Sequence, residues 1–148
     1  MSKYNLKTAR EKAQLERMID LRKRNICAFC PENIRQETTS KVEIETDYWI
    51  VKKNDFPYKN TKYHYLVIPK EHIKTVSELS DESKKEFLEV ISFLEKKFKF
   101  KSYAIGIRSG DIRLNGGSVE HLHAQIIVGD VDNPNHKPIR FKMSSSLN

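Results

Sequence analysis

Two histidines and a glutamine in the C-terminal third of the chain are the residues best suited to chemistry. His121, His123 and Gln125 occupy alternate positions shortly after the turn Asn115-Gly116-Gly117-Ser118. In an extended strand alternate side chains share one face, so these three polar groups would lie side by side. Backbone N–H groups of a glycine-rich turn can converge on an oxyanion, and a neutral imidazole can attack phosphorus. The pattern favours a reactive row beside an anion-binding turn.

Each part of this pattern also has a purely structural interpretation. The histidine row could be a half-buried edge strand, and Gly116-Gly117 could be an ordinary hairpin turn. We prefer the functional interpretation because three polar groups in a row are poor core material, since each needs a partner. In it, Ser118 adds a hydroxyl to the turn and Gln125 holds a phosphate oxygen without titrating. Positive charge that balances the phosphate could come from Lys70, Arg108 and Arg113.

The two cysteines of the chain form the motif Cys27-Ala28-Phe29-Cys30. In a reducing compartment this spacing indicates metal or redox chemistry more than a structural disulfide. A structural zinc ion takes four ligands, so histidines must complete any site that these thiols begin. The alternative is a pair of small buried thiols. The candidate histidine ligands are His64, His72, His121, His123 and His136.

Hydrophobic periodicity predicts the elements that must position these residues. Apolar side chains at three- and four-residue steps predict helices over residues 5–25 and 81–98, the second with Phe87, Val90, Ile91 and Leu94 on one face. Alternation predicts a hairpin over 42–51 and strands over 64–69, 102–107 and 121–128. The order of helices and strands favours an α+β domain around a mostly antiparallel sheet.

Composition sets the broad class of the protein. The 148 residues suit one domain, and the net charge of +7 favours anionic partners such as phosphates, nucleotides or nucleic acid. No apolar run approaches the roughly 20 residues that span a bilayer, and residues 1–12 lack the apolar core of a secretory signal. We therefore expect a cytoplasmic protein without a membrane partner.

Three motifs together resemble a known family. His121-Leu122-His123-Ala124-Gln125-Ile126-Ile127 resembles the His-φ-His-φ-His-φ-φ signature of the histidine triad (HIT) superfamily, with glutamine in the third position. His64-Tyr65-Leu66-Val67-Ile68-Pro69-Lys70-Glu71-His72 resembles the family's strand ending in Ile-Pro-Lys-x-His. Cys27-x-x-Cys30 is similar to the zinc-bearing branch. The motifs stand in the family's order, and the predicted helix over 81–98 separates the second histidine motif from the first.

The resemblance implies a fold and a set of roles. The fold would be a HIT-like, mostly antiparallel sheet with one long helix packed on it, plus an N-terminal helix. The domain division would be an N-terminal helical extension over 1–26, a catalytic domain over 27–130 and an irregular tail over 131–148. His123 would be the nucleophile, with Gln125, Ser118 and His64 as further catalytic residues. Substrate-binding residues would be Asn54, Phe56, Pro57, Asn115, Gly116, Gly117 and Ser118, and a structural zinc ion would be bound by Cys27, Cys30, His72 and His121.

The departures from the family signature narrow the expected reaction. Gln125 stands where the third histidine would be, as in the branch of galactose-1-phosphate uridylyltransferases and dinucleoside polyphosphate phosphorylases. Glutamine cannot donate a proton, so weakly basic leaving groups such as nucleotides suit it better than amines. The hydrolases of phosphoramidates usually carry an asparagine upstream of the turn, where this chain has Ser109-Gly110-Asp111.

We therefore predict a zinc-containing nucleotidyl transferase or hydrolase that acts on dinucleoside polyphosphates or related nucleotide phosphoanhydrides through a nucleotidyl-His123 intermediate. Family resemblance also implies a homodimer. One alternative is a nucleotide-binding sensor that kept the pocket and lost turnover. Another is a zinc-stabilised nucleic-acid-binding module, which the +7 charge favours and the interspersed acidic residues disfavour.

Overall fold

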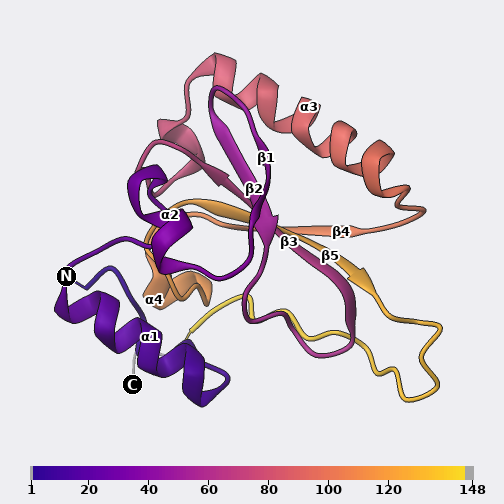
Figure 1. Ribbon diagram of the computed structural model, residues 1–148, viewed down its shortest axis with the longest axis horizontal. Helices are drawn as coiled ribbons and strands as arrows, with labels where there is room; N and C mark the ends of the chain where they lie inside the picture. Colours follow the sequence, from indigo (N-terminus) through magenta and orange to yellow (C-terminus); the bar gives the residue numbers. More distant parts are fainter. Residues whose placement is uncertain (1, 146–148) are drawn as a thin grey trace.

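The computed structural model describes residues 2–145 and has an α+β fold, as predicted (Figure 1). None of the helices in this range is long and apolar enough to cross a membrane. The elements in chain order are η1 (Leu6–Thr8), α1 (Lys12–Lys23), α2 (Pro31–Glu37), β1 (Val42–Glu45), β2 (Trp49–Lys53), β3 (Thr61–Pro69), η2 (Val76–Glu78), α3 (Asp81–Phe98), β4 (Ala104–Arg108), α4 (Ile112–Asn115) and β5 (His123–Gly129).

The five strands form one sheet in the order β1-β2-β3-β5-β4, and every neighbouring pair is antiparallel. The predicted hairpin is the β1–β2 pair. The long strand β3 lies at the centre of the sheet and pairs with β5, with Leu66 opposite Gln125. This pairing brings the two histidine motifs together, because the first lies on β3 and the second on β5.

One face of the sheet is apolar and carries α3, which runs along it in Figure 1. Ser80 caps the start of α3 by accepting a hydrogen bond from the Ser83 backbone N–H, and Lys99 ends it in the left-handed conformation. The indole N–H of Trp49 donates to the Ser83 carbonyl at 2.8 Å, which ties the helix to β2. The core here consists of Trp49, Val51, Tyr65, Val67, Ala124 and Ile126 from the sheet with Val90, Ile91 and Leu94 from α3.

The opposite face is apolar at one end and polar at the other. At the apolar end Ile34 of α2 packs with Ile50, Leu66 and Ile68, together with Phe29. At the other end His64, His123 and Gln125 are buried, on the same face as Leu66. Helix α1 and the chain after β5 pass over this side of the molecule (Figure 1). The polar residues are therefore covered by segments outside the sheet.

The prediction of one helix over 5–25 is wrong in its extent. The chain forms η1 and α1 with an extended break between them, where Glu11 has φ −146° and ψ 160°. The break is stabilised because the Arg10 backbone N–H donates to the Gln14 side chain at 2.9 Å. The helices α2 and α4 were not predicted, because seven and four residues are too few to show a helical period.

The packing of α3 gives a first prediction. Leu94 has no exposed surface, so Leu94→Ala should lower the free energy of unfolding by about 2–5 kcal/mol through lost burial and the cavity left behind. Leu88 on the same helix is 68% exposed, and Leu88→Ala should change the free energy of unfolding by less than about 0.5 kcal/mol. Urea unfolding followed by Trp49 fluorescence measures both. Equal losses for the two variants would contradict this packing.

Candidate active site and metal centre

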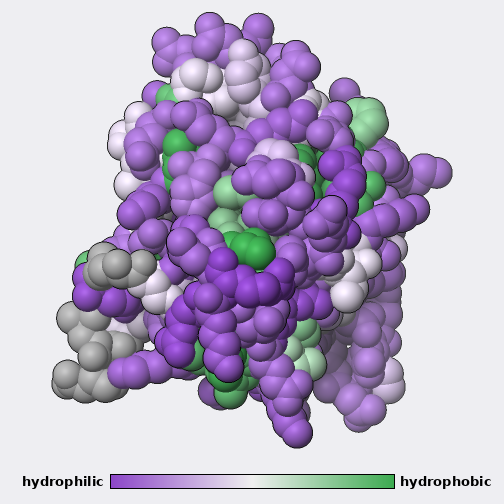
Figure 2. All heavy atoms as spheres, turned by 60° about the vertical axis from the view of Figure 1, so that its left-hand side comes forward, coloured by the Kyte–Doolittle hydropathy of each residue, from purple (hydrophilic) through white to green (hydrophobic). Residues whose placement is uncertain are grey.

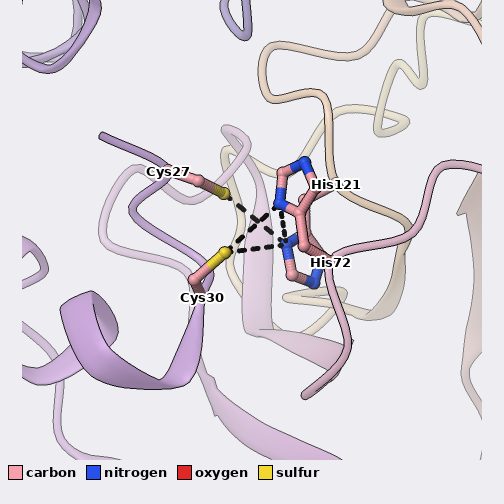
Figure 3. A group of neighbouring side chains, drawn as sticks. All are labelled: Cys27, Cys30, His72 and His121. Atoms are coloured by element: carbon pink, nitrogen blue, oxygen red, sulfur yellow. Dashed lines mark hydrogen bonds between the residues drawn. The ribbon is translucent and has the colours of Figure 1, made fainter. Parts of the chain in front are cut away.

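Four side chains from three parts of the chain converge beside the sheet. Cys27 and Cys30 lie in the turn that leads into α2, His72 follows β3, and His121 precedes β5. Their ligand atoms all lie within 4.8 Å of one another, and Figure 3 shows the four side chains pointing toward a common centre. The pair of thiols thus meets two of the five candidate histidines.

The geometry of this cluster fits a tetrahedral metal ion. Cys30 Sγ lies 3.2 Å from His72 Nδ1, Cys27 Sγ lies 3.5 Å from His121 Nδ1, and the two Nδ1 atoms are 3.2 Å apart. Tetrahedral bonds of about 2.0–2.3 Å would place neighbouring donors about 3.3–3.8 Å apart. His121 Nε2–H donates to the Pro69 carbonyl at 2.8 Å, so Nδ1 carries the lone pair that faces the centre.

The two thiols are buried and would bind a metal with loss of protons. Burial raises the pKa of the Cys30 thiol to about 12, and the neighbouring Cys27 contributes to this rise. Burial also raises the pKa of Cys27. A metal ion binds the thiolate, so an ion in this cluster must displace both protons and its binding will depend on pH.

His123 is buried on β5 and lines a cavity of about 100 Å³. Its Nδ1–H donates to the His121 carbonyl at 2.7 Å, which leaves Nε2 as the unprotonated nitrogen. Burial lowers the pKa of His123 to about 4, and the positive charge of Arg108 adds to this effect. The imidazole is therefore neutral at neutral pH, which is the form that can act as a nucleophile.

His64 on β3 fixes the orientation of Gln125. The Tyr58 backbone N–H donates to His64 Nδ1 at 3.1 Å, so the ring carries its proton on Nε2 and donates it to Gln125 Oε1 at 2.7 Å. Burial lowers the pKa of His64 to about 4, which keeps the ring neutral. The Asn54 amide nitrogen lies 3.3 Å from His64 Nε2. Because its oxygen is engaged, Gln125 presents its NH₂ group as a donor to the cavity that it lines.

The glycine-rich turn lines the same cavity through Gly116, Gly117 and Ser118. Gly116 has φ +73° and ends α4, a conformation that favours glycine. The Gly117 N–H already donates to the Asn115 side chain at 2.8 Å, and the Ser118 hydroxyl is hydrogen-bonded to that of Thr8 at 2.6 Å. The turn thus reaches the cavity with part of its hydrogen-bonding capacity in use.

The other predicted substrate-binding residues divide into two groups. Asn54 and Phe56 line the cavity with the turn, whereas Pro57 and Asn115 do not. Asn115 instead supports the turn from behind, through its bond to Gly117. Pro57 lies beside a separate surface depression near Lys59.

The prediction that His121, His123 and Gln125 share one strand is wrong for His121. The strand begins at His123, and the preceding segment pairs with the loop after β3, since the Leu122 N–H donates to the Ile73 carbonyl at 2.7 Å. His121 therefore belongs with Cys27, Cys30 and His72 to the candidate metal site, called the metal cluster, while His123 and Gln125 line the cavity.

Several cavity residues were not predicted from the sequence. The N-terminal segment contributes Arg10 and the α1 residues Gln14, Arg17, Met18 and Leu21.

A buried ion pair also lines the cavity. Lys52 is 1% exposed, and its ammonium lies 3.1 Å from the Asp55 carboxylate, which also accepts from Arg17. The signal for this pair was a lysine that directly follows the apolar strand residues 49–51 and stands three positions before an aspartate. Figure 2 brings the side with α1 and α2 forward and shows a largely hydrophilic surface with small hydrophobic areas between polar groups.

Comparison with known proteins decides the family. The model of the HIT domain family matches residues 35–132, two thirds of the chain, including both histidine motifs. The chain belongs to the HIT domain family. The N-terminal segment, the two cysteines and the end of the chain lie outside the matched residues.

Individual relatives agree with this assignment. A HIT family hydrolase from Clostridium thermocellum is 26% identical, over 76% of this chain and 96% of that one, with a TM-score of 0.54. A histidine triad nucleotide-binding protein from Candida albicans is also 26% identical, over 68% and 72% of the two chains, with a TM-score of 0.56. An uncharacterized protein of Archaeoglobus fulgidus is 29% identical over 115 residues; this HIT chain spans only 34% of its length.

The metal cluster gives a second prediction. Protein purified without chelator should contain about one equivalent of a tetrahedrally bound ion, measured by inductively coupled plasma mass spectrometry, because four suitable donors converge. Cys30→Ala should abolish this content and lower the melting temperature. His136→Ala, which changes a histidine outside the cluster, should keep both. Unchanged metal content in Cys30→Ala would show that the cluster does not hold the ion.

Proposed function

We propose that this HIT protein is a nucleotidyl transferase or hydrolase that acts on dinucleoside polyphosphates or related nucleotide phosphoanhydrides. The observation that carries the proposal is the hydrogen bond from His123 Nδ1–H to the His121 carbonyl, which leaves a neutral Nε2 as the reactive atom at the cavity. One solved relative is named a HIT family hydrolase and another a nucleotide-binding protein, which supports a role in nucleotide processing.

In the first step His123 Nε2 attacks the α-phosphorus. A P–N bond forms while the P–O bond to the leaving nucleotide breaks, and the bonding electron pair departs with that oxygen. The ring becomes positively charged, and the carbonyl of His121 accepts the hydrogen bond from Nδ1–H throughout. In the second step an oxygen of inorganic phosphate or water attacks the same phosphorus, and the P–N electrons return to Nε2. When water is the acceptor, its proton is released to solvent.

Gln125 and His64 position the phosphoryl group in this scheme. The NH₂ group of Gln125, oriented by His64, donates to a non-bridging phosphate oxygen whose charge grows in the transition state. Neither residue supplies a proton to the leaving group, because glutamine does not titrate and His64 stays neutral. Leaving groups that depart as anions, such as nucleotides, suit this site.

Zinc is the ion that best matches the donor set of the metal cluster, since two thiolates and two imidazoles form one of its common tetrahedral sites. Four protein ligands leave no open position for substrate or water, so the ion would be structural. The ligands of the ion adjoin the cavity through His121, and the ion would hold that residue in place.

We also propose a homodimer. Strand β4 is an edge of the sheet, and its apolar residues Ile105 and Ile107 are 41% and 46% exposed. An exposed apolar edge strand is a natural surface for pairing with a second chain.

Product analysis tests the reaction and gives a third prediction. With diadenosine tetraphosphate and inorganic phosphate, we expect ADP and ATP if phosphate resolves the intermediate; AMP and ATP formed without phosphate identify a hydrolase. His123→Ala should reduce turnover by at least about 10³-fold, as loss of a nucleophile does, whereas His136→Ala should not. Tight binding without turnover in the unmodified protein would instead identify a nucleotide sensor.

A further inference from the structure

Arg108 is a buried cation beside the nucleophile. It lies opposite His123 in the β4–β5 register and is 4% exposed. Its Nη2 donates to the Tyr58 hydroxyl at 3.1 Å, its Nη1 donates to two backbone carbonyls, and Phe141 stacks on its guanidinium at 4.0 Å. Among residues 2–145, no carboxylate lies within ion-pair distance of Arg108. A buried charge without a counter-ion is costly, so an anionic ligand would stabilise it.

Arg10 is a second cation on the same side of the cavity. Its guanidinium stacks on the Tyr58 ring at 4.5 Å and donates to the Phe56 carbonyl. Tyr58 is thus contacted by Arg10 on its ring and by Arg108 at its hydroxyl, which places the two guanidinium groups near each other. Within the described part of the chain Arg10 also has no carboxylate partner.

The charges that line the cavity do not balance. Its cations are Arg10, Arg17, Lys52 and Arg108, and its one carboxylate is Asp55. Asp55 is already bound by Lys52 and Arg17, which leaves the charges of Arg10 and Arg108 uncompensated. Guanidinium groups form charge-assisted hydrogen bonds with phosphate oxygens, so a chain of phosphates is a suitable counter-ion for two of them.

We propose that Arg108 binds the phosphoryl group that His123 attacks and that Arg10 binds the further phosphates of the leaving group. This proposal rests on the proposed function and narrows its substrate class to nucleotides with a phosphate chain beyond the attacked phosphorus. Arg10 comes from the N-terminal segment, outside residues 35–132 that match the HIT family. Substrate preference would therefore be set partly by a segment that the family domain does not include.

The test compares two substrates with the same nucleotidyl group. The leaving group of diadenosine tetraphosphate is ATP, which carries three phosphates, whereas that of the p-nitrophenyl ester of AMP is p-nitrophenolate, which carries none. Arg10→Gln should lower kcat/KM for the tetraphosphate by about 10- to 100-fold, the value of one or two charge-assisted hydrogen bonds, and change it for the ester by less than about 3-fold. Arg22→Gln, which removes an exposed charge of α1 outside this cavity, should change neither.

Arg108→Gln should lower kcat/KM for both substrates, and Arg108→Lys should recover part of the loss because it keeps the charge. Equal losses for the two substrates in Arg10→Gln, or no loss in either, would overturn the assignment of Arg10. A melting temperature equal to that of the unmodified protein separates these effects from misfolding.

A binding measurement tests this inference independently of turnover. If neither substrate is turned over, the proposed function fails, and calorimetric titration with AMP and diadenosine tetraphosphate still tests the phosphate site. The unmodified protein should then bind the tetraphosphate about 10- to 100-fold more tightly than AMP, and Arg10→Gln should remove that preference. Equal affinities for the two ligands in the unmodified protein would overturn the inference.

Discussion

The hydrogen bond between His123 and the His121 carbonyl links the two halves of the site. His121 is held on three sides: its Nε2–H donates to the Pro69 carbonyl, its Nδ1 faces the other metal-ligand atoms, and its own carbonyl accepts from His123. The side chain of His121 thus belongs to the metal cluster, while its backbone carbonyl orients His123. An ion bound by this cluster would hold His121 in place, and the carbonyl of that residue is the group that fixes the proton of His123 on Nδ1.

The apolar core on one face of the sheet allows the other face to bury neutral polar side chains. The apolar face under α3 supplies a continuous core, so the opposite face can hold His64, His123 and Gln125 without being the main source of stability. Each of these groups has a partner of defined chemistry, and each imidazole is kept neutral by its surroundings. These hydrogen bonds fix the orientation of the three side chains and leave His123 Nε2 and the Gln125 NH₂ group directed to the cavity.

Periodicity and motifs predicted the sheet and the helix α3 well, because long amphipathic segments carry a strong signal. They could not identify which two of five histidines meet the cysteines, since that depends on how the loops after β3 and before β5 fold together; only the family resemblance indicated His72 and His121. Arg10 could not be predicted either. An arginine in a charged N-terminal segment is typical of solvated surface, and only the extended break before α1 and the stacking on Tyr58 bring it to the cavity.

The cavity itself has a consequence for the order of events. At about 100 Å³ it is smaller than the roughly 300–1,000 Å³ of ordinary ligand pockets, and α1 forms part of its wall. An outward movement of the N-terminal segment would enlarge this space, so nucleotide entry and exit would be coupled to a conformational change of that segment. While that segment covers the cavity, a nucleotide held inside would be shielded from bulk water, and the size of the opening would limit which second reactant reaches it.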